Sequence, residues 1–309
     1  MSGFALDWLT LREAFDRQAR ERNAVAAAVQ AWRPQRAERG GAPLSVMDLA
    51  CGSGANLRVL APLLGGAQRW RLIDHDPALL AAVPETLTRW ADAHGLLCSV
   101  AGPDIAISGP AFAVEVTLQQ LDLALDLHEL PLAGTDLVTA SALLDLVSAS
   151  WLKTLVDLAS AANVALLFAL SVDGRIAWES TDPRDAAVQQ LFAAHQLRDK
   201  GFGPALGEAA VPLAARLASE AGYVVTQSAS DWVIDGLRGP SNDGPAMLAA
   251  MVDGLGGAAL EQWRETGPGA VACSEEDLIA WSARRHAALP DTRLCVGHVD
   301  LFAVPPAGG

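Results

Sequence analysis

The sequence predicts an α/β protein built on a seven-stranded, mostly parallel, doubly wound sheet. From residue 44 onward, short apolar runs alternate with helical patterns, which is typical of βαβ units whose helices cover both faces of a parallel sheet. After residue 170 this alternation stops, and the chain ends in two further extended segments. Two such segments indicate an antiparallel hairpin at the end of the sheet.

The seven strands are assigned from short apolar runs. Five of them lie in the first part of the chain, at 44–49, 69–74, 112–121, 136–141 and 163–170. The last two are the segments YVVTQSASDWVI, residues 223–234, and TRLCVGHVDLFAV, residues 292–304. Helical patterns separate the first five strands, near 55–64, 77–93, 123–130 and 142–160.

The N-terminal segment is expected to form a helical cap. Residues 3–32 have the apolar spacing of a helix, and the charged, Gly- and Pro-rich segment 33–43 is typical of a linker. We therefore expect a cap with its linker over residues 1–43, followed by a cofactor-binding domain over residues 44–309.

Helical insertions are expected after the fifth strand. One helix has Asp182 as N-cap and Pro183 at its first position, and is expected to end at Gly201. Helical sequence also covers about 205–221 and the Gly-rich stretch 240–288. These segments place the insertions of the domain at about 175–221 and 240–288.

Composition and charge disfavour several classes of partner. The net charge is −14, from 22 basic and 36 acidic residues without a Lys/Arg-rich tract, which argues against nucleic acid. No apolar run reaches the roughly 18 residues of a membrane span, and the charged N-terminal stretch lacks the apolar core of a secretory signal, so a cytoplasmic protein is expected. The 4 cysteines and 6 histidines are scattered, so neither a metal site nor a disulfide framework is expected. A small molecule is the expected partner, and the oligomeric state is not predicted.

The segment DLACGSG, from Asp48 to Gly54, is a glycine turn between a strand and a helix, where α/β proteins commonly bind part of a nucleotide. A phosphate-binding loop requires a lysine after its last glycine, and none follows Gly54. A dinucleotide site requires a third glycine where Leu57 stands, and the Asp48 carboxylate would repel a pyrophosphate. The turn therefore suits a nucleoside that is joined to a positively charged group.

Two segments together, VMDLACGSGANL and RWRLIDHDPALL, resemble motifs of the class I S-adenosylmethionine (SAM)-dependent methyltransferases. The first motif of that family is commonly D/E-x-G-x-G-x-G, and Ala50 replaces its first glycine here. In the family, an acid at the end of the second strand binds the SAM ribose, and Asp74 matches this position. The resemblance covers residues 44–170 and implies the methyltransferase fold with SAM as the cofactor.

The resemblance also implies which residues bind the cofactor. Gly52 and Gly54 would let the backbone approach the methionine and ribose, with Asp48 near the ammonium. Asp122 matches an acid that contacts the adenine amino group, although it is equally placed to cap a helix, and the end of the fourth strand would face the reactive methyl. The expected cofactor-binding residues are Asp48, Ala50, Gly52, Gly54, Asn56, Asp74, His75, Asp122, Leu123, Ala140, Ser141 and Arg20.

Methyl transfer requires a general base only where the nucleophile arrives protonated. The candidates are Asp145, one helical turn beyond Ser141, and His195, in the inserted helix. Each has a structural alternative, because Asp145 fits a solvent-facing acid near a helix N-terminus and His195 fits a packed, hydrogen-bonded histidine.

Other features stay open between a functional and a structural interpretation. Arg12 and Arg20 either hold the methionine carboxylate or belong to a solvated helical face with ion pairs. The segment RDKGFGPALG, residues 198–207, is either a lid with glycine hinges or the end of a helix. Three aromatic residues line an apolar pocket or belong to the core: Trp178, Phe202 and Trp232.

The expected function is methyl transfer from SAM to an oxygen, nitrogen or carbon of a small metabolite. Two alternatives rest on the same motifs. One is an enzyme that consumes SAM without transferring the methyl and releases methylthioadenosine, and the other is a non-catalytic SAM-binding regulatory subunit. The motifs do not separate these functions, because they position a cofactor without specifying an acceptor.

Overall fold

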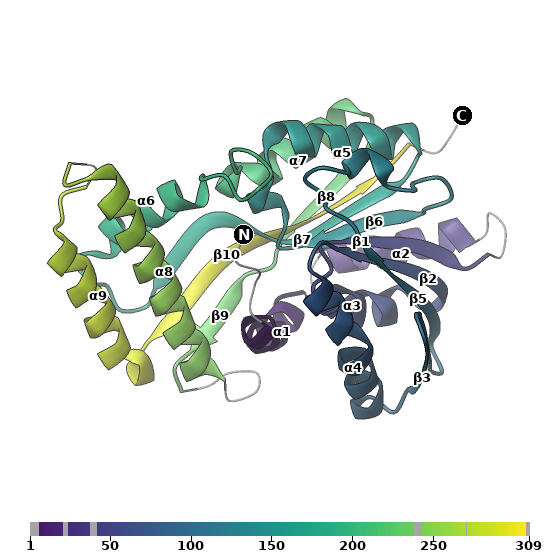
Figure 1. Cartoon of the computed structure of the whole chain (residues 1–309), viewed down its shortest axis with the longest axis horizontal. Coiled ribbons are helices and arrows are strands. Elements are labelled where there is room, and N and C mark those ends of the chain that lie inside the picture. Colours follow the sequence, from purple (N-terminus) through teal and green to yellow (C-terminus); the bar gives the residue numbers. More distant parts are fainter. Residues whose placement is uncertain (1–5, 21–23, 38–41, 238–242, 270, 307–309) are drawn as a thin grey trace.

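The computed structural model describes residues 6–20, 24–37, 42–237, 243–269 and 271–306. Within these residues ten strands form one sheet in the order β3-β4-β5-β2-β1-β6-β7-β10-β8, and β9 pairs with β10 beside this path (Figure 1). The strands are β1 (Leu44–Leu49), β2 (Gly66–Asp74), β3 (Leu97–Ala101), β4 (Asp104–Ser108), β5 (Phe112–Gln120), β6 (Leu137–Ser141), β7 (Ala165–Trp178), β8 (Val224–Ala229), β9 (Trp232–Asp235) and β10 (Arg293–Val304).

The helices of the described residues connect and cover these strands. The α-helices are α1 (Leu6–Arg20), α2 (Ala24–Ala37), α3 (Ala55–Leu64), α4 (Pro77–Ala93), α5 (Ala149–Ala161), α6 (Asp185–Gln196), α7 (Ala210–Glu220), α8 (Gly244–Thr266) and α9 (Glu275–Ala287). Short 3-10 helices lie at Leu127–Glu129, Leu144–Leu146, Gly207–Ala209 and Leu289–Asp291. None of these helices has both the length and the apolar character that crossing a membrane requires.

The strand directions confirm the predicted fold class. Strands β5, β2, β1, β6 and β7 are parallel to their neighbours in this order, and β10 runs antiparallel between β7 and β8. The seven central strands therefore form a mostly parallel sheet, and its last two strands, β10 and β8, are an antiparallel pair as the sequence predicts. The described sheet has more strands than predicted, because the β3–β4 hairpin extends one edge and the single strand expected over 223–234 is divided into β8 and β9, which both pair with β10.

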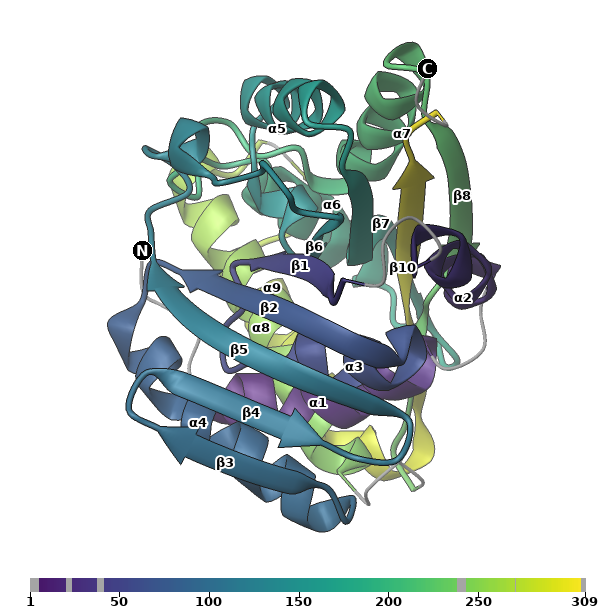
Figure 2. The same ribbon diagram turned by 90° about the vertical axis from the view of Figure 1, so that its right-hand side faces the viewer.

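Apolar cores on both faces make the sheet doubly wound. Helices α5 and α7 contribute to the core on one face, and α2, α3 and α4 contribute to the core on the other. The central strand β1 is buried except for Ser45, as expected for a strand that is covered on both faces. Near the β3 edge, β4 and β5 alternate between buried and exposed residues, and Figure 2 shows these strands in front with α3 and α4 behind them.

A second lobe lies at the far end of β7 and β10, to the left in Figure 1. The fifth strand does not end at residue 170 as predicted, because β7 continues to Trp178 and pairs along its length with β10. Helices α6, α8 and α9 pack there around a third apolar core, which also includes Phe15 of α1. The division into a cap and one domain with insertions stays a prediction. Helix α7 lies within the expected insertion 175–221, but it packs against α5 and β10 of the main sheet rather than in this lobe.

The N-terminal segment is helical as predicted over its described residues, but its predicted linker is not. Within residues 3–32, α1 extends to Arg20 and α2 begins at Ala24, and residues 3–5 and 21–23 lie outside the described part of the chain. The predicted linker 33–43 is helical at its start, because α2 continues to Ala37. Two separate helices can pack on different surfaces: α1 contacts β9 and α8, and α2 contacts β8, β10 and α3.

Two helices expected between strands are shorter than predicted because polar side chains cap the backbone there. In the segment 123–130 only a 3-10 turn forms, since the Asp122 carboxylate accepts the Ala124 N–H and stabilises a turn. The segment 142–160 is divided before α5, where Ser148 is the N-cap and its hydroxyl accepts the Trp151 N–H.

The first inserted helix is also shorter than predicted. Instead of spanning Asp182 to Gly201, α6 covers Asp185–Gln196. The Asp182 carboxylate accepts the Arg184 N–H in the turn that precedes the helix, so Asp182 caps that turn rather than the helix itself.

Candidate active site

The glycine turn lies at the carboxyl end of β1, between this strand and α3. Ala50, Gly52 and Gly54 all have positive φ, at 52°, 54° and 82°. Glycine adopts this left-handed conformation without strain, which explains the two glycines of the turn. The buried Asp74 carboxylate, at the end of β2, accepts the Gly52 N–H at 2.8 Å and the Asp76 N–H at 3.0 Å. Asp74 therefore fixes the turn to the start of α4, and a ribose hydroxyl would have to share its oxygens.

A chain of buried polar groups begins at Asp48. Oδ1 of Asp48 accepts a hydrogen bond from Asn56 Nδ2 at 2.7 Å, and Asn56 Oδ1 accepts one from Arg20 Nη1 at 3.0 Å. Oδ2 of Asp48 is buried and has no hydrogen-bond partner in the part of the chain that the structure describes. Burial raises the pKa of Asp48 to about 7, against the hydrogen bond from Asn56 and the charge of Arg20, which lower it.

A small cavity of about 60 Å³ lies over this carboxylate. The residues that line it come from β1, the glycine turn, the end of β6 and α1: Leu9, Arg12, Asp16, Asp48, Ala50, Cys51, Gly52, Ser53, Ala55, Asn56 and Ser141. Helix α1 covers the turn closely, because a Cβ atom built on Gly52 would lie 3.4 Å from Leu9 Cδ1. The cavity has room for about two water molecules, so it matches a small cationic group such as an ammonium rather than a whole nucleoside.

The structure brings together only part of the expected cofactor-binding set. Asp48, Ala50, Gly52, Asn56 and Ser141 line the small cavity. The other expected cofactor-binding residues are not among the described residues that line it. Gly54 is the N-cap of α3, Ala140 is buried in β6, and Arg20 is buried and donates to Asn56. His75 is half-exposed beside Asp74, Asp122 is exposed, and the buried Leu123 accepts a hydrogen bond from the Trp151 indole at its carbonyl oxygen.

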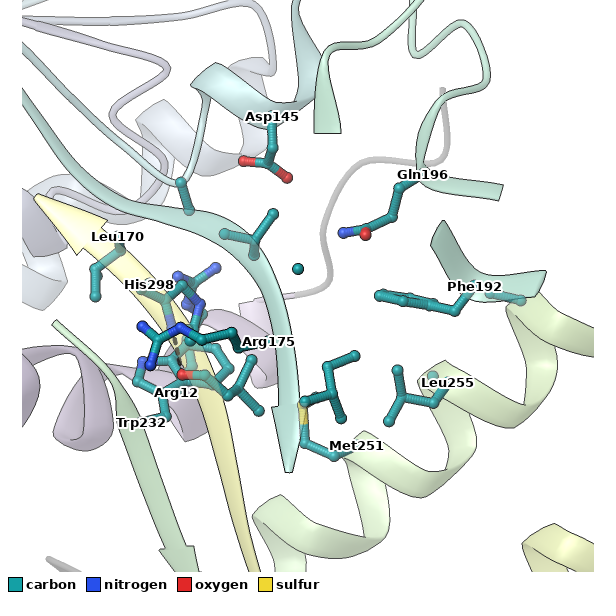
Figure 3. Close-up of a pocket in the computed structure, with 18 of the residues that line it drawn as sticks. Arg12, Asp145, Leu170, Arg175, Phe192, Gln196, Trp232, Met251, Leu255 and His298 are labelled. Carbon is teal, nitrogen blue, oxygen red and sulfur yellow. Dashed lines mark hydrogen bonds between the residues drawn. The ribbon is translucent and has the colours of Figure 1, made fainter. Parts of the chain in front are cut away.

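A larger cavity of about 400 Å³ adjoins the small one (Figure 3). Arg12 lines both cavities, and the consecutive residues Ser141 and Ala142 line one each. The wall is mostly apolar, which is typical of small-molecule sites. The apolar and aromatic side chains come from α1, β7, α6, β9, α8 and β10: Trp8, Val172, Ile176, Phe192, Trp232, Met251, Leu255 and Val296.

Asp145 lies in the wall of this larger cavity, in the 3-10 turn that follows β6. Figure 3 shows its carboxylate and the Gln196 amide directed toward the same space. Oδ1 of Asp145 is shielded from solvent and accepts no hydrogen bond from the described residues. Burial raises the pKa of Asp145 to about 6, although the positive charges of Arg12 and Lys200 oppose the shift. This placement differs from that of a solvent-facing acid, and its role as a base stays a prediction.

The second candidate base, His195, also lines the larger cavity. Its Nε2 lies 3.4 Å from Glu261 Oε2, and burial together with the charge of Lys200 lowers its pKa. Glu261 is an exposed residue of α8, so the acid that contacts His195 is solvated. A catalytic histidine is usually oriented by a buried acid instead, so this contact favours a structural role for His195.

Sequence reasoning did not select His298, a buried residue of β10 in the same cavity. Its Nδ1 lies 3.0 Å from the Val296 carbonyl oxygen, so Nδ1 carries the proton and Nε2 is an acceptor. Burial lowers the pKa of His298 to about 4 and keeps it neutral. No motif marks this residue, because a single histidine in a strand pattern has no characteristic spacing.

The aromatic residues that the sequence left between pocket and core have different positions in the structure. Trp232 lines the larger cavity, and the Arg12 guanidinium lies 5.0 Å over its ring. Trp178 belongs to the third core, where it lies edge-on to Trp281, and Phe202 packs against Trp151. Arg12 pairs with Asp16 at 2.9 Å on α1.

Comparison with known proteins gives matches in fold only. No protein-family model matches the chain, and no curated protein matches it. A cyclopropane-fatty-acyl-phospholipid synthase-like protein from Lactobacillus casei is 14% identical over 91% of this chain and 92% of its own, with a TM-score of 0.45. A cyclopropane synthase from Mycobacterium tuberculosis is 11% identical over 85% of this chain and 78% of its own, with a TM-score of 0.40. A geranyl diphosphate C-methyltransferase from Streptomyces coelicolor is 10% identical over 90% of this chain and 78% of its own, with a TM-score of 0.36. At such low identity, no substrate or residue role passes from these proteins to this chain.

Proposed function

We propose that this chain is a SAM-dependent methyltransferase that acts on a small molecule bound in the larger cavity. One observation carries the proposal: the buried Asp48 and the half-buried Asp145 each have a shielded carboxylate oxygen without a partner among the described residues. These two residues line two adjoining cavities that share Arg12. A buried carboxylate oxygen without a partner is costly, so such an oxygen is typical of a site for a bound cation or a proton.

The residues of the small cavity fit the amino-acid end of SAM. The free oxygen of Asp48 suits the ammonium group, and the Arg12 guanidinium in the same cavity suits the carboxylate. Gly52 and Ala50 present backbone there, and Asp74 holds the turn in place. When bound, SAM supplies a methyl group that its sulfonium has already activated. The protein therefore has to align the acceptor and keep water out.

Asp145 is the proposed general base. With a pKa of about 6 it is ionised at neutral pH, and it can take the proton that a hydroxyl or ammonium group must lose before attack. The apolar wall around it excludes water, and the neutral Nε2 of His298 offers a further acceptor for orienting the substrate. Both an oxygen and a nitrogen nucleophile satisfy this arrangement.

The larger cavity favours transfer to an acceptor over the two alternatives. An enzyme that only fragments SAM needs no second apolar cavity, and a regulatory subunit needs no buried acid with a raised pKa beside its ligand. The purified protein should be incubated with SAM alone and then with a small-molecule cell extract, and the products analysed by mass spectrometry. S-adenosylhomocysteine together with a methylated species, formed only with extract, is the expected result. Methylthioadenosine formed without extract would overturn the proposal, and so would binding of SAM without any turnover.

A further inference from the structure

The larger cavity contains a lysine, Lys200, whose ammonium forms no ion pair with the residues that the structure describes. The two arginines of the cavity wall are neutralised by neighbours: Arg12 pairs with Asp16 at 2.9 Å, and Arg175 pairs with two carboxylates on its exposed side. Lys200 differs from them, because among the described residues its ammonium makes one hydrogen bond, to the His195 carbonyl oxygen at 3.3 Å, and no ion pair. Of the described lysine and arginine residues that line the cavity, Lys200 is therefore the one without an ion pair.

Lys200 is held in this position by the turn that follows α6. The Asp199 carboxylate accepts the Gly203 N–H at 3.0 Å, which fixes the backbone on both sides of Lys200. Phe202 then packs edge-on against Trp151 at the start of α5, with ring centroids 5.6 Å apart. The segment is anchored to the main sheet, so it presents Lys200 to the cavity from a fixed position.

The unpaired charges in the cavity are complementary to a substrate with two polar ends. Asp145 has an oxygen without a described partner, and the Lys200 ammonium forms no ion pair with a described residue. The two groups do not pair with each other, although both line the same space. Burial and the charge of Arg198 lower the pKa of Lys200, against the charges of Glu261 and Asp145, which raise it.

We propose that Lys200 binds a carboxylate group of the substrate, so that the acceptor is a carboxylic acid with an apolar or aromatic body and a separate nucleophile at Asp145. The apolar body would lie against Phe192, Met251 and Leu255, which Figure 3 shows together on one side of the cavity. This inference rests on the proposed function, since it assigns the substrate class of that same site.

The charge balance favours a carboxylate over a phosphate. Lys200 carries a single positive charge, which matches a monoanion, and the Asp145 carboxylate that lines the same cavity would repel a dianion more strongly than a monoanion. Phosphate groups are commonly held by backbone N–H groups at a helix N-terminus or by a bidentate arginine. Of the two cavity arginines, Arg175 is engaged by two carboxylates, and Arg12, which pairs with Asp16, is already assigned to the methionine carboxylate of SAM.

Three probes with the same aromatic ring test this proposal: phenylacetate, phenylacetamide and phenethylamine. Their binding to the full-length protein is measured by ligand-observed NMR titration, with and without S-adenosylhomocysteine. Phenylacetate should bind about tenfold tighter than phenylacetamide, because a charge-assisted hydrogen bond is replaced by a neutral one. K200M should abolish this preference, and K200R should retain part of it. The matched control is R198M, since Arg198 pairs with Glu261 and does not line the cavity, and it should keep the full preference.

The outcomes separate the two proposals. Wild-type binding of phenylacetate no tighter than phenylacetamide, including no detectable binding of either, would overturn the role of Lys200, and so would a preference that survives in K200M. Tighter binding of phenethylamine would point to Asp145 as the dominant anchor and would overturn it as well. If phenylacetate binds in a Lys200-dependent way but S-adenosylhomocysteine does not bind, the proposed methyltransferase function fails and the substrate class stands.

Discussion

Asn56 donates a hydrogen bond to one oxygen of Asp48 at 2.7 Å and leaves the other oxygen buried without a partner among the described residues. Burial of this half-satisfied carboxylate raises its pKa to about 7. A charge held in this way destabilises the fold unless a ligand supplies the missing partner. Replacement of the Asp48 carboxylate by a neutral group should therefore raise the free energy of unfolding and lower the affinity for the cofactor.

The stability of the protein should fall with rising pH because of Asp48. Its folded pKa of about 7 is above the ordinary aspartate pKa of 3.8, so the folded state binds the proton more tightly. This stabilisation is lost as pH rises from 3.8 to about 7. Asp48→Asn removes the dependence. Urea denaturation should show that this variant gains about 2 to 3 kcal/mol relative to wild type between pH 5 and pH 8. A difference that is the same at both pH values would contradict the prediction.

The same substitution should weaken SAM binding. Replacing the Asp48 carboxylate by an amide removes the charge that faces the ammonium, and we expect the dissociation constant measured by calorimetry at pH 8 to rise at least about tenfold. Asp145→Asn is the matched control, because it removes a buried charge from the neighbouring cavity and should leave SAM affinity unchanged. Equal affinity of wild type and Asp48→Asn would remove Asp48 from the cofactor site.

Turnover should depend on Asp145 in its ionised form. Since burial raises the pKa of Asp145 to about 6, activity should decline as pH falls through 6, where the carboxylate takes up a proton. Asp145→Asn should lower kcat by about 10² to 10⁴-fold and remove this acidic limb. The exposed acid Asp157, which pairs with Lys153 on α5, provides a control variant that should leave kcat unchanged. An acidic limb that persists in Asp145→Asn would assign the titration to another group.

The sequence predicted most accurately those elements whose ends are set by adjacent residues in the chain. The first strand and its helix have the predicted bounds, 44–49 and 55–64, because the glycine turn between them marks both ends. The β3–β4 hairpin was not predicted because its sequence is rich in small and polar residues, and only Ile105 and Ile107 point inward from β4. Where few apolar residues are buried, the period-2 pattern is too weak to recognise.

The larger cavity was predictable only in part, because it joins segments that are distant in sequence. Asp145 follows a strand whose end the motifs had placed at the site, so sequence reasoning selected it. His298 and Arg12 reach the same cavity from β10 and α1, and their positions depend on β10 pairing with β7 and on α1 lying across the glycine turn. No spacing in the sequence encodes these contacts.

Asp74 should be required for both the glycine turn and the cofactor. Asp74→Ala leaves the N–H groups of Gly52 and Asp76 without an acceptor, which should cost about 1 to 3 kcal/mol for each buried group, and SAM affinity should fall with the loss of the turn. Asp76→Ala separates the two effects. It removes the N-cap of α4, at a cost of about 1 kcal/mol, and should leave SAM affinity intact. Equal SAM affinity in wild type and Asp74→Ala would exclude Asp74 from the cofactor site.

Arg12 and Arg20 of α1 should respond differently to replacement by methionine. Arg20 is buried, donates to Asn56 and lies 3.9 Å from Asp300, so Arg20→Met should lower the free energy of unfolding by about 3 kcal/mol as buried charges lose their partner. Arg12 lines both cavities, so Arg12→Met should leave stability nearly unchanged but raise both the SAM dissociation constant and the KM for the acceptor about tenfold.

Calorimetry with SAM and urea denaturation of both variants distinguish a ligand contact from a structural one. Arg12→Lys keeps the charge but loses the bidentate geometry, so it should recover only part of the SAM affinity. If Arg12→Met binds SAM as tightly as wild type, its pairing with Asp16 is purely structural, and the methionine carboxylate must be held elsewhere. A KM effect without a change in SAM affinity would instead place Arg12 on the acceptor side of the boundary between the cavities.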